Sequence, residues 1–207
     1  MNNSNQALNI VLLPPIDVAK EAMRLSRLIN ERYQTEFILD GKNKYPHLTL
    51  YQIEIPGVNL KKTLKAVYYL FQKRPRIISK ITGIRNYQTF ISFEFNKTAE
   101  LYKLHRKIVN GLEKFREGIK VSVALKGFKK FTASQKSDLE KYGSLGVMEN
   151  FWPHITLTRL KSENDINAVR RLLTFKEFGP IIFEKAAVGK LSDHGTVTRI
   201  IEEYRLN

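Results

Sequence analysis

Two six-residue blocks of the chain repeat the same arrangement of histidine and threonine. Residues 45–50 read Tyr-Pro-His-Leu-Thr-Leu and residues 152–157 read Trp-Pro-His-Ile-Thr-Leu, so the blocks agree in chemical type at every position. Histidine titrates near neutral pH, and a threonine hydroxyl can donate a hydrogen bond to an anionic oxygen. A single His-x-Thr sequence carries little information, whereas two copies with the same flanking residues indicate a common function.

The repeated block suits the displacement of an oxygen at phosphorus. Such a reaction needs one group to take a proton from the attacking oxygen and another to protonate the leaving oxygen. His47 and His154 on opposite walls of a cleft would meet this need, and Thr49 and Thr156 would hold the non-bridging oxygens. Neither block contains the further carboxylates or histidines that a metal site requires, so we expect no catalytic metal and no cofactor. Which histidine is the acid stays open.

Other aromatic and histidine residues have two interpretations each. Tyr45, Tyr51 and Trp152 flank the repeated histidines and can either stack on a nucleobase or pack into the core. His105 falls at the edge of an apolar helical stripe, which favours a buried structural histidine. His194 precedes a glycine between two expected strands, which favours a turn residue, with lining of the site as the alternative.

A β-strand through each block would place its histidine and threonine on one face, because alternate side chains of a strand share a face. The intervening leucine and isoleucine residues would then point into the core. The proline before each histidine lacks an N–H group and fits the first position of a strand. A helix and two strands are expected after each block, so we predict two β-α-β-β units, approximately residues 7–116 and 117–207.

The apolar periodicity predicts an α/β fold of the α+β type. Strands are expected at 7–13, 45–55, 76–85, 89–95, 154–160, 181–191 and 196–206. Helices are expected at 17–33, 59–71, 98–115 and 162–173. The less regular stretch 117–150 is expected to hold a strand near 120–125 and a short helix near 134–142. We therefore predict one domain, 1–207, with two pseudo-symmetric lobes whose antiparallel sheets flank a central cleft.

Charge and composition narrow the class of protein. The chain has 207 residues and a net charge of +15, and the stretch from Lys61 to Arg85 holds eight basic residues and no acidic one. This excess favours a polyanionic partner, RNA first. The absence of cysteine excludes thiol catalysis, cysteine-ligated zinc and disulfides. No apolar run approaches the roughly 18 residues of a membrane span, and no signal-peptide pattern is present, so we expect a cytoplasmic monomer without membrane binding.

Two His-x-Thr motifs on strands of duplicated units resemble the 2H (two-histidine) phosphoesterase superfamily. That superfamily includes bacterial 2′-5′ RNA ligase-like proteins and cyclic nucleotide phosphodiesterases. The resemblance covers residues 10–206, and Asp193-His194-Gly195-Thr196 is similar to the Gly-Thr hairpin that ends many members. It implies a bilobal fold in which His47 and His154 are catalytic and Thr49 and Thr156 bind phosphate. Residues 117–150 match no part of the family pattern.

The resemblance implies a metal-independent phosphoric diester hydrolase. Its expected substrates are 2′,3′-cyclic phosphate ends or 2′-5′ phosphodiester bonds of RNA or nucleotides, and the expected reaction opens a cyclic phosphate to a 2′-phosphomonoester. Three alternatives stay open: 2′-5′ ligation of RNA by the same site, a non-catalytic RNA-binding protein of the same fold, and a nucleotide phosphodiesterase without an RNA partner.

Overall fold

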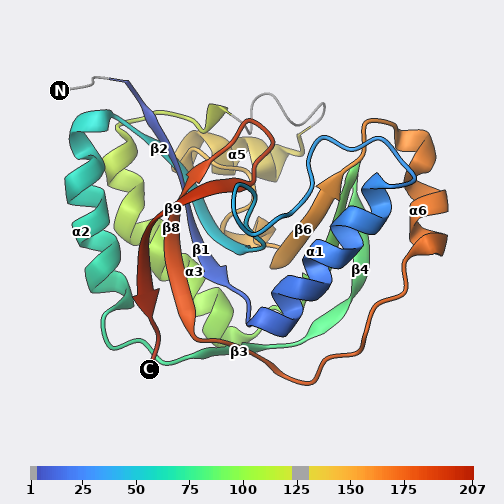
Figure 1. Ribbon diagram of the computed structural model, residues 1–207. Coiled ribbons are helices and arrows are strands. Elements are labelled where there is room, and N and C mark those ends of the chain that lie inside the picture. The colour runs from blue at the N-terminus through green and yellow to red at the C-terminus, as the bar shows by residue number, and fades with distance from the viewer. Residues whose placement is uncertain (1–3, 123–130) are drawn as a thin grey trace.

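The fold is built on one antiparallel β-sheet. The computed structural model describes residues 4–122 and 131–207 (Figure 1). Its strands are β1 (Gln6–Leu13), β2 (Leu48–Ile55), β3 (Ile77–Ser79), β4 (Ile81–Tyr87), β5 (Phe90–Phe95), β6 (His154–Arg159), β7 (Ile181–Phe183), β8 (Lys185–Leu191) and β9 (Val197–Arg205). Seven of them form the large sheet, in the order β4-β5-β6-β2-β1-β8-β9, and β3 pairs with β7 in a small second sheet. The expected antiparallel α/β fold is confirmed.

The helices fall close to their expected positions. They are α1 (Ile16–Asn30), α2 (Leu60–Phe71), α3 (Ala99–Leu112), α5 (Ala133–Tyr142) and α6 (Ile166–Leu172). Of the strand expected near 120–125, residues 120–122 form no strand and residues 123–125 lie outside the described residues. Among residues 4–122 and 131–207, no helix has the length and apolar character that a membrane crossing requires.

Two of the expected strands are each divided into two shorter ones. The stretch 76–85 becomes β3 and β4, separated by Lys80, and the stretch 181–191 becomes β7 and β8, separated by Glu184. The first part of each pairs in the small sheet, and the second part pairs in the large sheet. The chain therefore passes from one sheet to the other at both places.

The two chain halves are interleaved in the large sheet. The strand order is symmetric about the boundary between β6 and β2: β5 and then β4 lie beyond β6, and β1 and then β8 lie beyond β2. This symmetry matches β1-α1-β2-α2-β3-β4 with β5-α3-β6-α6-β7-β8, and β9 is added at one edge. In this matching β5 and α3 take the places that β1 and α1 take in the first half, and the division of the chain into units near residue 116 stays a prediction.

The helices cover one face of the sheet. α3 packs on β2 and α1 packs on β6, while α2 and α6 lie at opposite sides of the molecule (Figure 1). Leu48, Leu50, Ile155 and Leu157 are at most 1% exposed, which confirms that these residues of the repeated blocks point into the core. Their neighbours in the two strands consequently face the other side of the sheet. β2 and β6 meet at the single register pair Leu48 and Ile155, so the two blocks lie side by side.

Candidate active site

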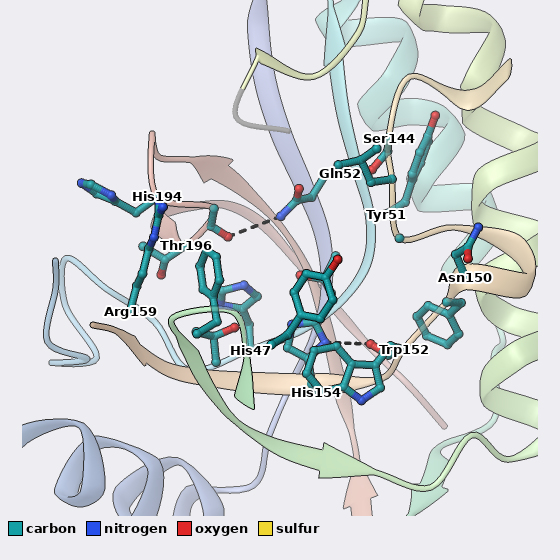
Figure 2. Close-up of a pocket in the computed structure, with 18 of the residues that line it drawn as sticks. His47, Tyr51, Gln52, Ser144, Asn150, Trp152, His154, Arg159, His194 and Thr196 are labelled. Atoms are coloured by element: carbon teal, nitrogen blue, oxygen red, sulfur yellow. Dashed lines mark hydrogen bonds between the residues drawn. The ribbon is translucent and has the colours of Figure 1, made fainter. Parts of the chain in front are cut away.

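A cavity of about 490 Å³ lies over the junction of β2 and β6, a size typical of small-ligand sites (Figure 2). His47, Thr49, His154 and Thr156 all line it. Its remaining walls come from further residues of β2 and β6, from β4 and β5, from Phe37, from Gln135 of α5, from residues 144–152, and from the turn between β8 and β9. The structure therefore brings together the four residues that the sequence singled out, and their catalytic role stays a prediction.

His47 lies immediately before β2 and is 6% exposed. Its Nδ1 donates to the Tyr45 carbonyl oxygen at 2.7 Å, and since a carbonyl can only accept, Nε2 is the nitrogen that titrates. The amide of Asn9, on β1, lies 3.3 Å from that Nε2 and donates to Thr49 Oγ1 at 3.0 Å. Burial lowers the pKa of His47 to about 4, and the nearby His154 lowers the pKa further, against the effect of the Tyr45 carbonyl.

His154 has the same backbone contact but different side-chain neighbours. Its Nδ1 donates to the Trp152 carbonyl oxygen at 2.7 Å, so Nε2 is again the nitrogen that titrates. The Trp152 ring stacks on the imidazole, with centroids 4.2 Å apart (Figure 2). Burial lowers the pKa of His154, whereas the Trp152 carbonyl and the negative charge of Glu94 raise it.

The shared backbone contact follows from the repeated sequence. In both blocks the acceptor belongs to the aromatic residue two positions before the histidine, Tyr45 or Trp152, with a proline between them. A residue before proline is confined to extended conformations, and this restriction favours a fixed direction for its carbonyl. The aromatic-Pro-His sequence thus places the proton on Nδ1 in both halves of the molecule.

Sequence reasoning missed four polar residues of the site: Asn9, Gln52, Arg85 and Arg159. Gln52 follows Thr49 by three positions and Arg159 follows Thr156 by three, and both line the cavity. The Gln52 amide donates to the Gly195 carbonyl at 3.4 Å, and the Arg159 guanidinium lies 5.0 Å from the Phe90 ring centroid. Extending the repeated block by three residues would have found this pair.

The three aromatic residues occupy different environments. Trp152 lines the cavity against His154. Tyr51 also lines the cavity, but it is 1% exposed and its hydroxyl donates to the Tyr142 carbonyl at 2.6 Å, so most of its ring packs in the core. Tyr45 lies outside the lining residues and bridges to Val197. Stacking of a base on any of the three stays a prediction.

The other two histidines are also placed. His105 is fully buried, with Nδ1 donating to the Leu50 carbonyl at 2.7 Å and Nε2 accepting from the Met148 N–H at 2.8 Å, which confirms a structural histidine. Burial lowers its pKa to about 4. His194 lies in the turn between β8 and β9 and also lines the cavity, so both of its interpretations apply.

The donor set around the cavity does not form a metal site. Among the residues that the structure describes, no group of three or more His, Asp or Glu side chains is placed to hold a metal ion. Each of the two histidines donates from Nδ1 to a backbone carbonyl, which leaves Nε2 as the nitrogen that can bind a proton. The site thus combines two titratable nitrogens, two hydroxyls and two arginines around one space.

Solved structures of other proteins share the fold of this chain. They include Escherichia coli LigT complexed with NADP⁺ (TM-score 0.53, 12% identity, 99% of both chains), a phosphoesterase (TM-score 0.50, 13% identity, 99% of both chains) and TT0787 of Thermus thermophilus (TM-score 0.57, 18% identity, 97% of both chains). The chain therefore shares the fold of these proteins.

At the level of sequence, the chain belongs to the family described as "Protein of unknown function (DUF1045)", whose model matches residues 55–192. The match contains His154 and Thr156 and begins after His47 and Thr49. A comparison with curated proteins found no match.

Proposed function

We propose that this protein is a metal-independent phosphoesterase that opens 2′,3′-cyclic phosphate ends of RNA or nucleotides, or cleaves 2′-5′ phosphodiester bonds, with His47 and His154 as acid and base. The observation that carries the proposal is the shared cavity, in which two histidines with Nδ1 fixed by carbonyls leave both Nε2 atoms to titrate. The fold of LigT and of a phosphoesterase supports the same class of reaction.

On a 2′,3′-cyclic phosphate the proposed reaction is an in-line displacement. A water oxygen forms a bond to phosphorus while a neutral histidine takes one of its protons. The bond between phosphorus and the 3′ oxygen breaks, and the protonated histidine gives its proton to that oxygen. The product is a 2′-phosphomonoester with a free 3′-hydroxyl, and proton exchange with solvent restores both histidines.

The remaining polar groups of the cavity suit the charge of this substrate. Thr49 accepts from the Asn9 amide, which leaves the hydroxyl hydrogen available for a non-bridging phosphate oxygen. Thr156 and Arg159 lie on the other side of the same space. The net charge of +15 favours a substrate that extends into a polyanion, so we propose RNA ends ahead of free nucleotides.

Product analysis on a short RNA that ends in a 2′,3′-cyclic phosphate tests the proposal. The expected product is the 2′-phosphate, and the same protein with both histidines replaced by alanine is the control. Parallel reactions with a cyclic mononucleotide and with a 2′-5′-linked dinucleotide define which substrate is preferred. RNA binding without turnover of any of the three would favour the non-catalytic alternative, and joining of RNA ends would show ligation.

A further inference from the structure

Glu94, on β5, connects three residues of the His154 wall. It is the register partner of His154 across the β5–β6 pair. Its Oε1 accepts from the Trp152 indole N–H at 2.9 Å and from the Arg85 guanidinium at 2.6 Å. The Glu94 side chain is 27% exposed, so its charge is only partly screened by solvent.

These contacts fix Trp152 between two neighbours. One ring neighbour is His154, with centroids 4.2 Å apart and planes inclined by 21°, and the other is Tyr87, at 6.3 Å. The indole N–H is held by Glu94, so the ring cannot turn away without losing a charge-assisted hydrogen bond. An aromatic face against an imidazole favours the imidazolium, because the π-electrons attract a cation.

The side-chain contacts of His47 favour its neutral form, unlike those of His154. The Asn9 amide directs an N–H group toward Nε2 of His47, a contact that favours the neutral ring with its lone pair. Among residues 4–122 and 131–207, no carboxylate contributes to the pKa of His47, and the positive form of His154 disfavours a second positive charge there. Burial lowers the pKa of both histidines, whereas the side-chain contacts of the two walls act in opposite directions, with Glu94 raising the pKa of His154.

We infer that Glu94 is a positioning residue that prepares His154 to be the proton donor of the reaction, with His47 as the proton acceptor. This inference rests on the proposed function. In the opening of a cyclic phosphate, the water proton moves to Nε2 of His47 and the proton on Nε2 of His154 moves to the leaving 3′ oxygen.

Glu94→Gln is the sharpest variant, because glutamine keeps the size and the acceptor for the Trp152 N–H and removes only the charge. NMR titration of the imidazoles in the purified protein should show the pKa of His154 lower by about 1 unit, less than for an unpaired buried carboxylate because Arg85 shares the charge. The pKa of His47 should change less. This measurement needs no activity, so it is independent of the proposed function.

A control variant is needed to show that the expected pKa shift comes from Glu94 and not from the loss of any nearby charge. The other charged groups that line the cavity come from β4, β6, the turn before Trp152 and the turn between β8 and β9: Arg85, Arg159, Glu149, Asp193 and His194. Glu149→Gln also removes one negative charge, from a residue that lines the cavity, but its carboxylate accepts from the Tyr102 hydroxyl rather than from the His154 wall. We expect this control to shift the pKa of His154 less than Glu94→Gln does.

Kinetics supply the second readout. The pH profile of kcat/KM for a cyclic-phosphate RNA should lose activity on its alkaline side in Glu94→Gln, by about tenfold at a given pH, because the proton donor is depleted earlier. The acidic side should stay in place. Glu94→Asp, which restores the charge, should return the alkaline side toward its original position.

Two results would overturn the inference: an unchanged His154 pKa in Glu94→Gln, or a shift confined to the acidic side of the profile. A folded wild-type protein without activity on any tested phosphodiester would instead overturn the proposed function. Circular dichroism of each variant separates both outcomes from a failure to fold.

Discussion

The walls around His47 and His154 contain the same six-residue pattern but differ in the side chains that surround each histidine. Each histidine donates from Nδ1 to the carbonyl two residues earlier, at 2.7 Å in both cases. Beyond that contact the first wall offers the neutral amide of Asn9, and the second offers a carboxylate and an indole ring. The local sequence determines which ring nitrogen of each histidine carries the proton in the neutral form. The side chains of the neighbouring strand shift the pKa of that histidine.

The register of the neighbouring strands explains this difference. Leu12 lies opposite Leu48 in the first wall, and Phe93 lies opposite Ile155 in the second, so β1 and β5 occupy equivalent places. One position further along, Leu13 on β1 corresponds to Glu94 on β5. The two halves thus share the His-x-Thr block and differ in the strand beside it.

Removal of either imidazole tests whether the two walls act on one reaction, and it has the largest expected effect. His47→Ala and His154→Ala should each lower kcat by about 10²- to 10⁴-fold, the usual contribution of a general acid or base. The double variant should lose much less than the product of the two, since both groups serve one transition state. Rates come from the cyclic-phosphate RNA assay with folding checked by circular dichroism, and near-normal turnover in either single variant would contradict the assignment.

Replacement of the threonines should lower kcat less than replacement of the histidines. Thr49→Val and Thr156→Val remove a hydroxyl at almost constant volume, and each should lower kcat by about 10- to 100-fold, at or below the usual effect of losing one oxyanion donor. The Asn9 amide donates to Thr49 and also contacts His47. Asn9→Leu removes both contacts, so it should reduce kcat as well. If valine at both positions left kcat unchanged and altered only KM, the hydroxyls would serve binding alone.

His105 is a buried histidine outside the cavity and serves as a reference for the acid stability of the two walls. Burial lowers the pKa of His105 and of His47 to about 4 each, whereas an unfolded histidine titrates near pH ~6.5. Between these values the unfolded chain binds more protons, so stability is present above pH ~6.5 and is lost as pH falls toward about 4. The loss is at most about 3 kcal/mol for each residue.

Urea unfolding at pH 7 and pH 4.5 measures this dependence. His105→Leu should be less stable at pH 7 by about 1–3 kcal/mol, because the Met148 N–H loses its acceptor. The same variant should lose less stability on acidification than the wild-type protein does. Equal losses in both proteins would show that the buried state of His105 does not control the acid sensitivity.

The smallest expected effect is that of a chelator. If the two histidines carry protons independently, activity in the RNA assay should be unchanged after incubation with EDTA. Inactivation by EDTA, followed by recovery with zinc or manganese, would mean that a metal ion joins the two walls and that neither histidine acts as described. A mock incubation without chelator is the control.

The sequence was sufficient for the site residues that repeat and insufficient for those that do not. His47, Thr49, His154 and Thr156 could be predicted because the duplication shows them twice. The helices were predictable from their apolar periodicity. Gln52 and Arg159 share a spacing after the repeated threonines, so the signal was present but unused.

The remaining features depend on contacts between distant strands. Asn9 and Glu94 reach the histidines only because β1 pairs with β2 and β5 pairs with β6 in one particular register, with a bulge in each pair. Register is set by the whole packed sheet, and a shift of one residue would turn both side chains to the other face. The position of the unit boundary stays a prediction, since helix, strand and strand follow both blocks wherever the boundary is drawn.

The interleaving of strands from the two halves affects how the chain folds. β8, near the end of the chain, pairs with β1 at its beginning, and β4 from the first unit completes the edge beside β5 from the second. The pairing of β1 with β8 joins segments that are distant in sequence, and such pairings form slowly because the long intervening chain must first close into a loop. Cut in the turn between β4 and β5, either fragment would present unpaired strand edges, and the two should fold only on each other. A chain with a single unit would for the same reason require a second copy of itself to complete its sheet.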